Sequence, residues 1–108
     1  MPVIPRDELL EILREVKGKL KEILGDDLVE VILFGSYARG EARDGSDVDV
    51  LLVTRRRLSL EEHDKLNEIT EKYVLEKGII ISLIVYPLSP RMEHDPLIQT
   101  VHVEGIKV

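Results

Sequence analysis

Two apolar segments flank a loop that is rich in glycine, and this arrangement requires a fold that contains a β-sheet. The segments are Val29–Phe34 and Val48–Val53. Both are short and rich in β-branched and other aliphatic residues, which is typical of strands that are largely buried. The loop between them starts at Gly35 and contains Gly40 and Gly45. Glycine tolerates positive φ angles and lets a ligand approach the backbone closely, so the sharp turn after the first strand is a candidate binding site.

Helical patterns lie before the first strand and after the second. In residues 9–24, apolar side chains recur every three to four residues between charged ones, which predicts an amphipathic helix ending at Gly25. Ser59 is an N-cap type residue with Glu62 three positions later, so a second helix should begin there and run to about Glu76. The side chains that this second helix is expected to bury are Leu60, Leu66, Ile69, Tyr73 and Val74, or their neighbours.

The C-terminal third of the chain predicts one more strand and a short helix. Ile79–Tyr86 is another β-branched run, and Pro87 and Pro90 follow it as turn signals. A short helix is expected from Pro96 to about Glu104, stopped by Gly105. The order helix, strand, strand, helix, strand, short helix predicts an α/β domain in which the three strands share one sheet. At 108 residues, we expect a single domain covering 1–108.

Two aspartates open the second apolar segment. Side chains at i and i+2 leave the same face of a strand about 6–7 Å apart, so Asp47 and Asp49 can converge on one ion. Two ionised carboxylates at this short separation would repel each other. A Mg²⁺ ion between them would remove the energetic cost of that repulsion. In an isolated Asp-x-Asp pair, the first aspartate more often caps the loop and the second lies at the solvated rim of an edge strand. The glycine-serine turn upstream favours the metal site over that interpretation.

The turn at Gly35 and Ser36 carries groups that suit phosphate. It can offer backbone N–H groups and a hydroxyl. Arg39 lies in the same loop and could bind phosphate oxygens with its guanidinium, but the sequence leaves solvation of this side chain equally open. Arg43 is interpreted as solvated. Together, the turn and the aspartates predict a metal–phosphate site.

Composition excludes several classes of function. The formal charge is −6, from 15 basic and 21 acidic residues, which argues against a protein that mainly binds a nucleic-acid backbone. Aromatic residues make up 4%, too few for a base-stacking platform. There is no cysteine, so disulfides and thiolate sites need no consideration. Neither a signal peptide nor an apolar stretch of membrane length is evident, so we expect a cytoplasmic protein without membrane association.

The pattern Gly-Ser, ten residues, Asp-x-Asp resembles the signature of the DNA polymerase beta-like nucleotidyltransferases, and the short chain resembles their minimal branch. Such minimal proteins are often encoded beside a HEPN-domain protein. The resemblance implies a small mixed sheet with helices packed on it. It also implies transfer of a nucleoside monophosphate from a nucleoside triphosphate, with ATP expected, to a hydroxyl of a protein or small molecule, using Mg²⁺ or Mn²⁺. The residues so implied are Gly35, Ser36 and Arg39 for the triphosphate and Asp47 and Asp49 for metal and catalysis.

One position departs from the family pattern. Active members carry a third acidic residue on a later strand, whereas the central polar residue of Ile79–Tyr86 is Ser82. Serine is at best a neutral oxygen ligand and a poor general base. Two hypotheses follow: a metal-dependent nucleotidyltransferase, or a catalytically weak binding subunit that acts as the antitoxin-type partner of a HEPN protein. Because one small domain has little surface to enclose an acceptor, we expect a HEPN-type partner or a second copy.

Overall fold

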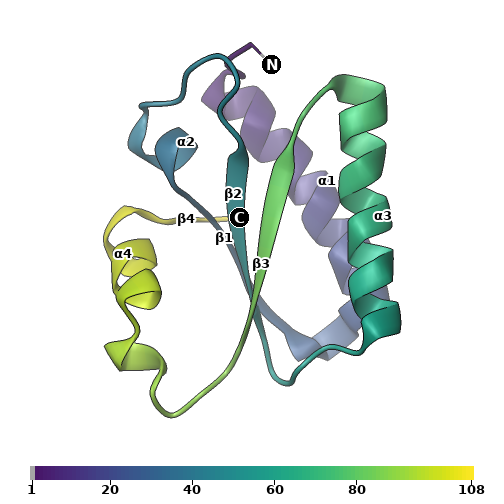
Figure 1. Ribbon diagram of the computed structural model, residues 1–108, viewed down its shortest axis with the longest axis vertical. Coiled ribbons are helices and arrows are strands. Elements are labelled where there is room, and N and C mark those ends of the chain that lie inside the picture. The colour runs from purple at the N-terminus through teal and green to yellow at the C-terminus, as the bar shows by residue number, and fades with distance from the viewer. Residues whose placement is uncertain (1) are drawn as a thin grey trace.

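A four-stranded mixed sheet forms the centre of the protein (Figure 1). The computed structural model describes residues 2–108. The strands lie in the order β3-β2-β1-β4, with β1 (Leu28–Phe34) antiparallel to both β2 (Val48–Thr54) and β4 (Ile106–Lys107). The edge strand β3 (Ile81–Pro87) runs parallel to β2. The expected α/β fold with a mixed sheet is therefore confirmed.

Two long helices, α1 (Arg6–Leu24) and α3 (Leu60–Lys77), cover one face of this sheet (Figure 1). Every second residue of β2 points toward them, starting with Val48 and Val50, and these side chains are fully buried. Burying an aliphatic side chain of this size stabilises the fold by about 1.5–3 kcal/mol relative to leaving it exposed. The α1 side chains that complete this core are Leu9, Ile12, Leu13, Val16, Leu20 and Leu24.

The start of α3 confirms the predicted capping box. The Ser59 hydroxyl accepts the Glu62 N–H at 3.1 Å, and the Glu62 carboxylate accepts the Ser59 N–H at 2.9 Å. The predicted burial of Leu60 and Val74 is wrong, because these side chains are 84% and 42% exposed. Helix α3 lies over the β3 edge of the sheet and packs mainly against α1 and β3, and the narrow stripe that it buries is centred on Leu66 and Tyr73.

The other face of the sheet is covered only in part, by α4 (Pro96–Glu104) (Figure 1). Six buried side chains form a second, smaller core there: Ile32, Phe34, Leu51, Val53, Ile98 and Val101. The Asp95 carboxylate caps α4 by accepting the Leu97 N–H at 2.9 Å and also accepts the Tyr86 hydroxyl at 2.7 Å. This second contact ties the start of α4 to β3.

Four short elements were not predicted. They are the single-turn helix α2 (Ser36–Arg39), the 3₁₀ turns η1 (Gly25–Asp27) and η2 (Met92–His94), and β4. None is long enough to show a hydrophobic period in the sequence. Strand β3 begins at Ile81 rather than Ile79. No helix among residues 2–108 has the length and apolar character needed to span a membrane.

Candidate functional site

The turn after β1 is shaped by Gly35. This residue is buried and has φ 77° and ψ −156°, a backbone region that is essentially restricted to glycine. A Cβ atom added to Gly35 would collide with the Asp49 carboxylate oxygen Oδ2. The Asp49 side chain therefore lies directly against the backbone of the turn, and any other residue at position 35 would displace it. This contact brings the two parts of the predicted site together.

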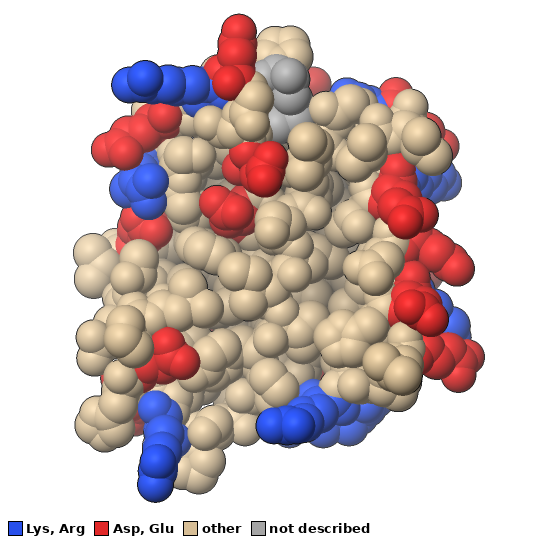
Figure 2. All heavy atoms as spheres, viewed as in Figure 1, with Lys and Arg blue, Asp and Glu red and all other residues tan. Residues whose placement is uncertain are grey.

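Strand register places Asp49 in the middle of the site. It pairs with Phe34 on β1 and with Ser82 on β3, so these three side chains leave the same face of the sheet. Asp47 immediately precedes β2, and its carboxylate lies near enough to Asp49 to raise the pKa of that residue. Asp47 is exposed and Asp49 is half-buried. Figure 2 shows this face as largely uncharged, with a small acidic group in its upper half and most other charges around the rim.

The electrostatics of Asp49 suit a bound cation. Burial raises the pKa of Asp49 above the usual range of an aspartate, and the Asp47 carboxylate raises it further. Arg39 opposes this effect, whereas Glu104 adds to it. A divalent cation between the two aspartates would relieve both the desolvation and the repulsion, so these residues fit a hard metal ion with oxygen ligands.

Asp47 and Asp49 are a candidate pair of metal ligands, and no third acidic, histidine or cysteine side chain of the described chain completes a metal site with them. Within residues 2–108, no group of three or more histidine, cysteine, aspartate or glutamate side chains is placed to hold a metal ion. Ser82 stands beside Asp49 on β3, in the position that the third carboxylate was expected to fill. Any further ligands would have to come from phosphate oxygens and water, as is usual for Mg²⁺.

Arg39 lies at the end of α2 and has two acidic partners. Its Nη1 donates to Glu104 Oε2 at 3.0 Å and its Nε donates to Glu41 Oε2 at 3.0 Å. Glu104 Oε1 also accepts the Gly35 N–H at 3.3 Å. Arg39 is therefore bound to carboxylates rather than freely solvated, and its guanidinium borders the turn at Gly35.

Glu104 is a site residue that the sequence analysis missed. It lies at the last position of α4, where an acidic side chain is opposed by the helix dipole. That unfavourable placement is a weak signal in the sequence, and it could have drawn attention to the residue. Its pairing with Arg39 could not have been predicted, since the two residues are 65 positions apart in the chain.

The turn is held from behind by the N-terminal segment. Tyr37 on α2 is buried, and its hydroxyl accepts the Ile4 N–H at 3.3 Å. Arg6 Nη2 donates to the carbonyl oxygens of Tyr37 and Ala38 at 3.3 and 2.9 Å. These contacts fix α2, and with it Ser36, which is half-buried at the first helical position.

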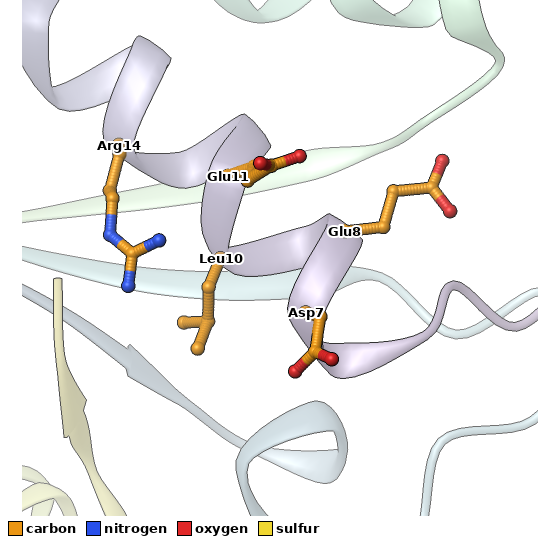
Figure 3. Close-up of a pocket in the computed structure, with 5 residues that line it drawn as sticks. All are labelled: Asp7, Glu8, Leu10, Glu11 and Arg14. Carbon is orange, nitrogen blue, oxygen red and sulfur yellow. The ribbon is translucent and has the colours of Figure 1, made fainter.

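Two hollows elsewhere do not share this chemistry. One, with a volume of about 390 Å³, lies on the surface of α1 and is lined by Asp7, Glu8, Leu10, Glu11 and Arg14 (Figure 3). All five come from one helix on the opposite side of the sheet from Asp49, so this hollow has no connection to the site. The other, of about 570 Å³, is mainly apolar and lies beside α4, with Ile32, Leu51, Val53, Ile98 and Val101 in its wall.

Comparison with known proteins decides the family. The profile of the nucleotidyltransferase domain matches residues 13–108, which include the turn and both aspartates. The chain belongs to the nucleotidyltransferase domain family. A provisionally named protein adenylyltransferase from Methanocaldococcus jannaschii is 46% identical over 79 residues, which cover 73% of this chain and 80% of that protein. The resemblance inferred from the Gly-Ser and Asp-x-Asp motifs is therefore confirmed.

Solved structures of nucleotidyltransferases share the fold. A toxin–antitoxin structure with AMP-PNP superposes with a TM-score of 0.58 at 21% identity, covering 86% of this chain and 69% of that one. A chain from the structure of a tri-AMPylated Shewanella oneidensis HEPN toxin in complex with MNT antitoxin superposes with a TM-score of 0.50 at 20% identity. The match covers 87% of this chain and 69% of that one. At such identities the likeness establishes the architecture of the nucleotidyltransferase domain alone.

Proposed function

We propose that this nucleotidyltransferase domain transfers an adenylyl group from ATP to a hydroxyl group of a protein, with Mg²⁺ or Mn²⁺ held by Asp47 and Asp49. The observation that carries the proposal is the contact between the Asp49 carboxylate and the backbone of the Gly35 turn. It joins a metal-binding type of side chain to a phosphate-binding type of turn. The Methanocaldococcus relative, provisionally named a protein adenylyltransferase, supports ATP and a protein as the substrates.

Each residue of the site has a role in this reaction. The Gly35 and Ser36 backbone and the Ser36 hydroxyl would bind triphosphate oxygens, and Arg39 would neutralise part of their charge. The acceptor oxygen attacks the α-phosphorus, the bond from that phosphorus to the oxygen bridging to the β-phosphate breaks, and pyrophosphate leaves. The proton of the acceptor hydroxyl passes to water. A bound divalent cation supplies charge neutralisation for the phosphates.

Ser82 limits this chemistry in the isolated chain. It lies beside Asp49 but is neither anionic nor basic, so no third carboxylate on β3 accepts the proton of the attacking hydroxyl. Loss of a positioned general base typically costs about 10²–10⁴-fold in rate. We therefore expect slow transfer by the chain alone.

The serine at position 82 also supports a second candidate function. With Ser82 in place of a carboxylate, the chain can bind nucleotide and serve mainly as a partner subunit. The Shewanella complex of a HEPN toxin with its MNT antitoxin supports a HEPN protein as that partner. In this case the complex forms whether or not adenylyl transfer occurs.

The test is transfer from ATP labelled on the α-phosphate, with and without a co-encoded HEPN protein. We expect wild type to label the partner slowly, Asp49→Asn to label nothing, and Ser82→Asp to be faster than wild type. Ser82→Asn is the matched control, because it adds a similar side chain without the charge. Fast transfer by wild type that Asp49→Asn abolishes would show that two carboxylates suffice. No transfer by any variant, with a stable complex, would favour the partner function and refute the enzymatic one.

A further inference from the structure

The side chain of Glu104 lies within the turn that the proposed function assigns to phosphate. Its Oε1 accepts the Gly35 N–H at 3.3 Å, and its Oε2 accepts Arg39 Nη1 at 3.0 Å. The Glu104 side chain is 14% exposed, whereas that of Glu41, the other partner of Arg39, is 67% exposed. Glu104 is thus held inside the site, and Glu41 is a surface contact.

A glutamate carboxylate presents the same chemistry to these donors as a phosphate group does. Both are anions with several acceptor oxygens, and both bind a guanidinium and a backbone N–H through charge-assisted hydrogen bonds. We propose that Glu104 is an internal anion that occupies the phosphate donors of the site and must be displaced when a nucleoside triphosphate binds. This inference rests on the proposed function, because it takes the Gly35 N–H and Arg39 as the phosphate donors.

The position of Glu104 is otherwise unfavourable, which makes its displacement possible. As the last residue of α4 it faces the negative end of the helix dipole. It also adds to the negative potential at Asp49, whose pKa it helps to raise. The contacts with Arg39 and Gly35 oppose these two costs, and a ligand that takes over both donors leaves Glu104 free to turn toward solvent.

The helix that carries Glu104 is fixed independently of this side chain. Its first turn is tied to β3 by the hydrogen bond from Tyr86 to Asp95 at 2.7 Å. At its other end, Gly105 packs so closely on the Val101 carbonyl and the Ile32 side chain that a Cβ atom would not fit. Rotation of the Glu104 side chain therefore suffices, and α4 keeps its place on the sheet.

Displacement has a consequence for ligand choice. While Glu104 is in place, it competes with the nucleotide for the Arg39 guanidinium, and Asp47 and Asp49 repel any anion that arrives without a cation. A Mg²⁺ ion bound with the nucleotide offsets part of the repulsion from Asp47, Asp49 and Glu104, whereas free ATP meets that repulsion in full. Glu104 thereby favours the metal complex of the nucleotide over the free anion.

The test is a calorimetric titration of ATP, with Mg²⁺ and with EDTA, into wild type, Glu104→Gln and Glu41→Gln. We expect Glu104→Gln to bind Mg-ATP roughly three- to tenfold more tightly than wild type, and to gain still more affinity for free ATP. Glu41→Gln removes the same charge from the same guanidinium but leaves the Gly35 N–H occupied, so it should stay within about twofold of wild type. Glu104→Ala, which also removes the amide oxygen, should behave like Glu104→Gln.

The outcomes distinguish failure of this inference from failure of the proposed function. If wild type binds Mg-ATP and Glu104→Gln and Glu104→Ala bind it no more tightly, the inference is wrong and the proposed function stands. An equal gain in Glu41→Gln would also refute the inference, since the effect would then reflect net charge alone. If all four proteins unfold at similar temperatures and none binds the nucleotide, the proposed function fails and the inference fails with it.

Discussion

Replacing Gly35 with alanine tests the contact on which the candidate site depends. The Gly35 backbone has φ 77° and ψ −156°, and an L-residue held in that region costs about 1–3 kcal/mol. The added Cβ would also displace the Asp49 carboxylate, and overpacking of this kind costs a further 1–3 kcal/mol, roughly. Gly35→Ala should therefore lower the free energy of unfolding by about 2–6 kcal/mol.

A double-mutant cycle with Asp49→Ala separates these two costs. Without the carboxylate, the closest remaining Asp49 atom is Cβ, at 3.2 Å from the added methyl group, which a small shift accommodates. In that background Gly35→Ala should cost only the backbone part, about 1–3 kcal/mol. Gly40→Ala is the control, because Gly40 also has a positive φ of 74° but nothing lies within 4 Å of its added Cβ; it should cost about 1–2 kcal/mol.

The assay is urea unfolding followed by circular dichroism, with thermal unfolding as a second measure. For a domain of this size, each kcal/mol corresponds to about 4–8 °C in Tm. If Gly35→Ala costs the same in the wild-type and Asp49→Ala backgrounds, Asp49 does not lie against the turn. The geometry proposed for the metal–phosphate site would then be wrong.

Three other measurements address the site and its supports. Calorimetry of Mg-ATP binding should show a large loss of affinity in the double variant Asp47→Asn with Asp49→Asn, and equal binding would exclude these residues as the metal site. Arg56 and the Ser59 cap lower the pKa of Glu62 to about 2, below its ordinary value of 4.5. The stability that Glu62 contributes is therefore present above pH 4.5 and is lost as pH falls toward 2. Arg56→Ala should flatten this part of the curve of unfolding free energy against pH, and an unchanged curve would contradict the assignment. Gly18→Ala should stabilise the fold by about 0.5–1 kcal/mol, because Gly18 is inside α1 with nothing within 4 Å of an added Cβ, and a fall in Tm would show otherwise.

The parts of the fold that were predictable are those with long, regular patterns. Helix α1 shows its apolar stripe over several turns, and β1 and β2 are continuous aliphatic runs, so their existence follows from local chemistry. The capping box at Ser59 and the stop at Gly105 are likewise local. By contrast, β4 is two residues long and exists only because Ile106 and Lys107 pair with β1. The exposure of Leu60 depends on where α3 lies over the sheet. No local sequence pattern predicts that placement.

The residues of the candidate site also separate into those that a local sequence pattern predicts and those that it does not. Gly35, Ser36, Asp47 and Asp49 could be selected in advance because their spacing has a geometric meaning on two adjacent strands. Glu104 could not, since it reaches the site through the packing of α4 on the sheet. The sequence also left Arg39 undecided between phosphate and solvent, and the structure shows a third arrangement, with two carboxylates as its partners. For Glu104 and its pairing with Arg39, the missing information was a contact between segments 65 residues apart.

The antiparallel pairing of β1 with β2 also affects how the site assembles during folding. Because the end of β1 and the start of β2 meet at one end of a single hairpin, Gly35 and Asp49 come together by closing one short loop. Short loops cost little entropy to close, and contacts of this kind form quickly. Ser82 reaches Asp49 only after α3 has crossed over to set β3 beside β2, and Glu104 only after α4 has docked. The hairpin half of the site thus depends on local pairing, whereas Ser82 and Glu104, the neighbours that adjust its chemistry, depend on contacts that close longer stretches of chain.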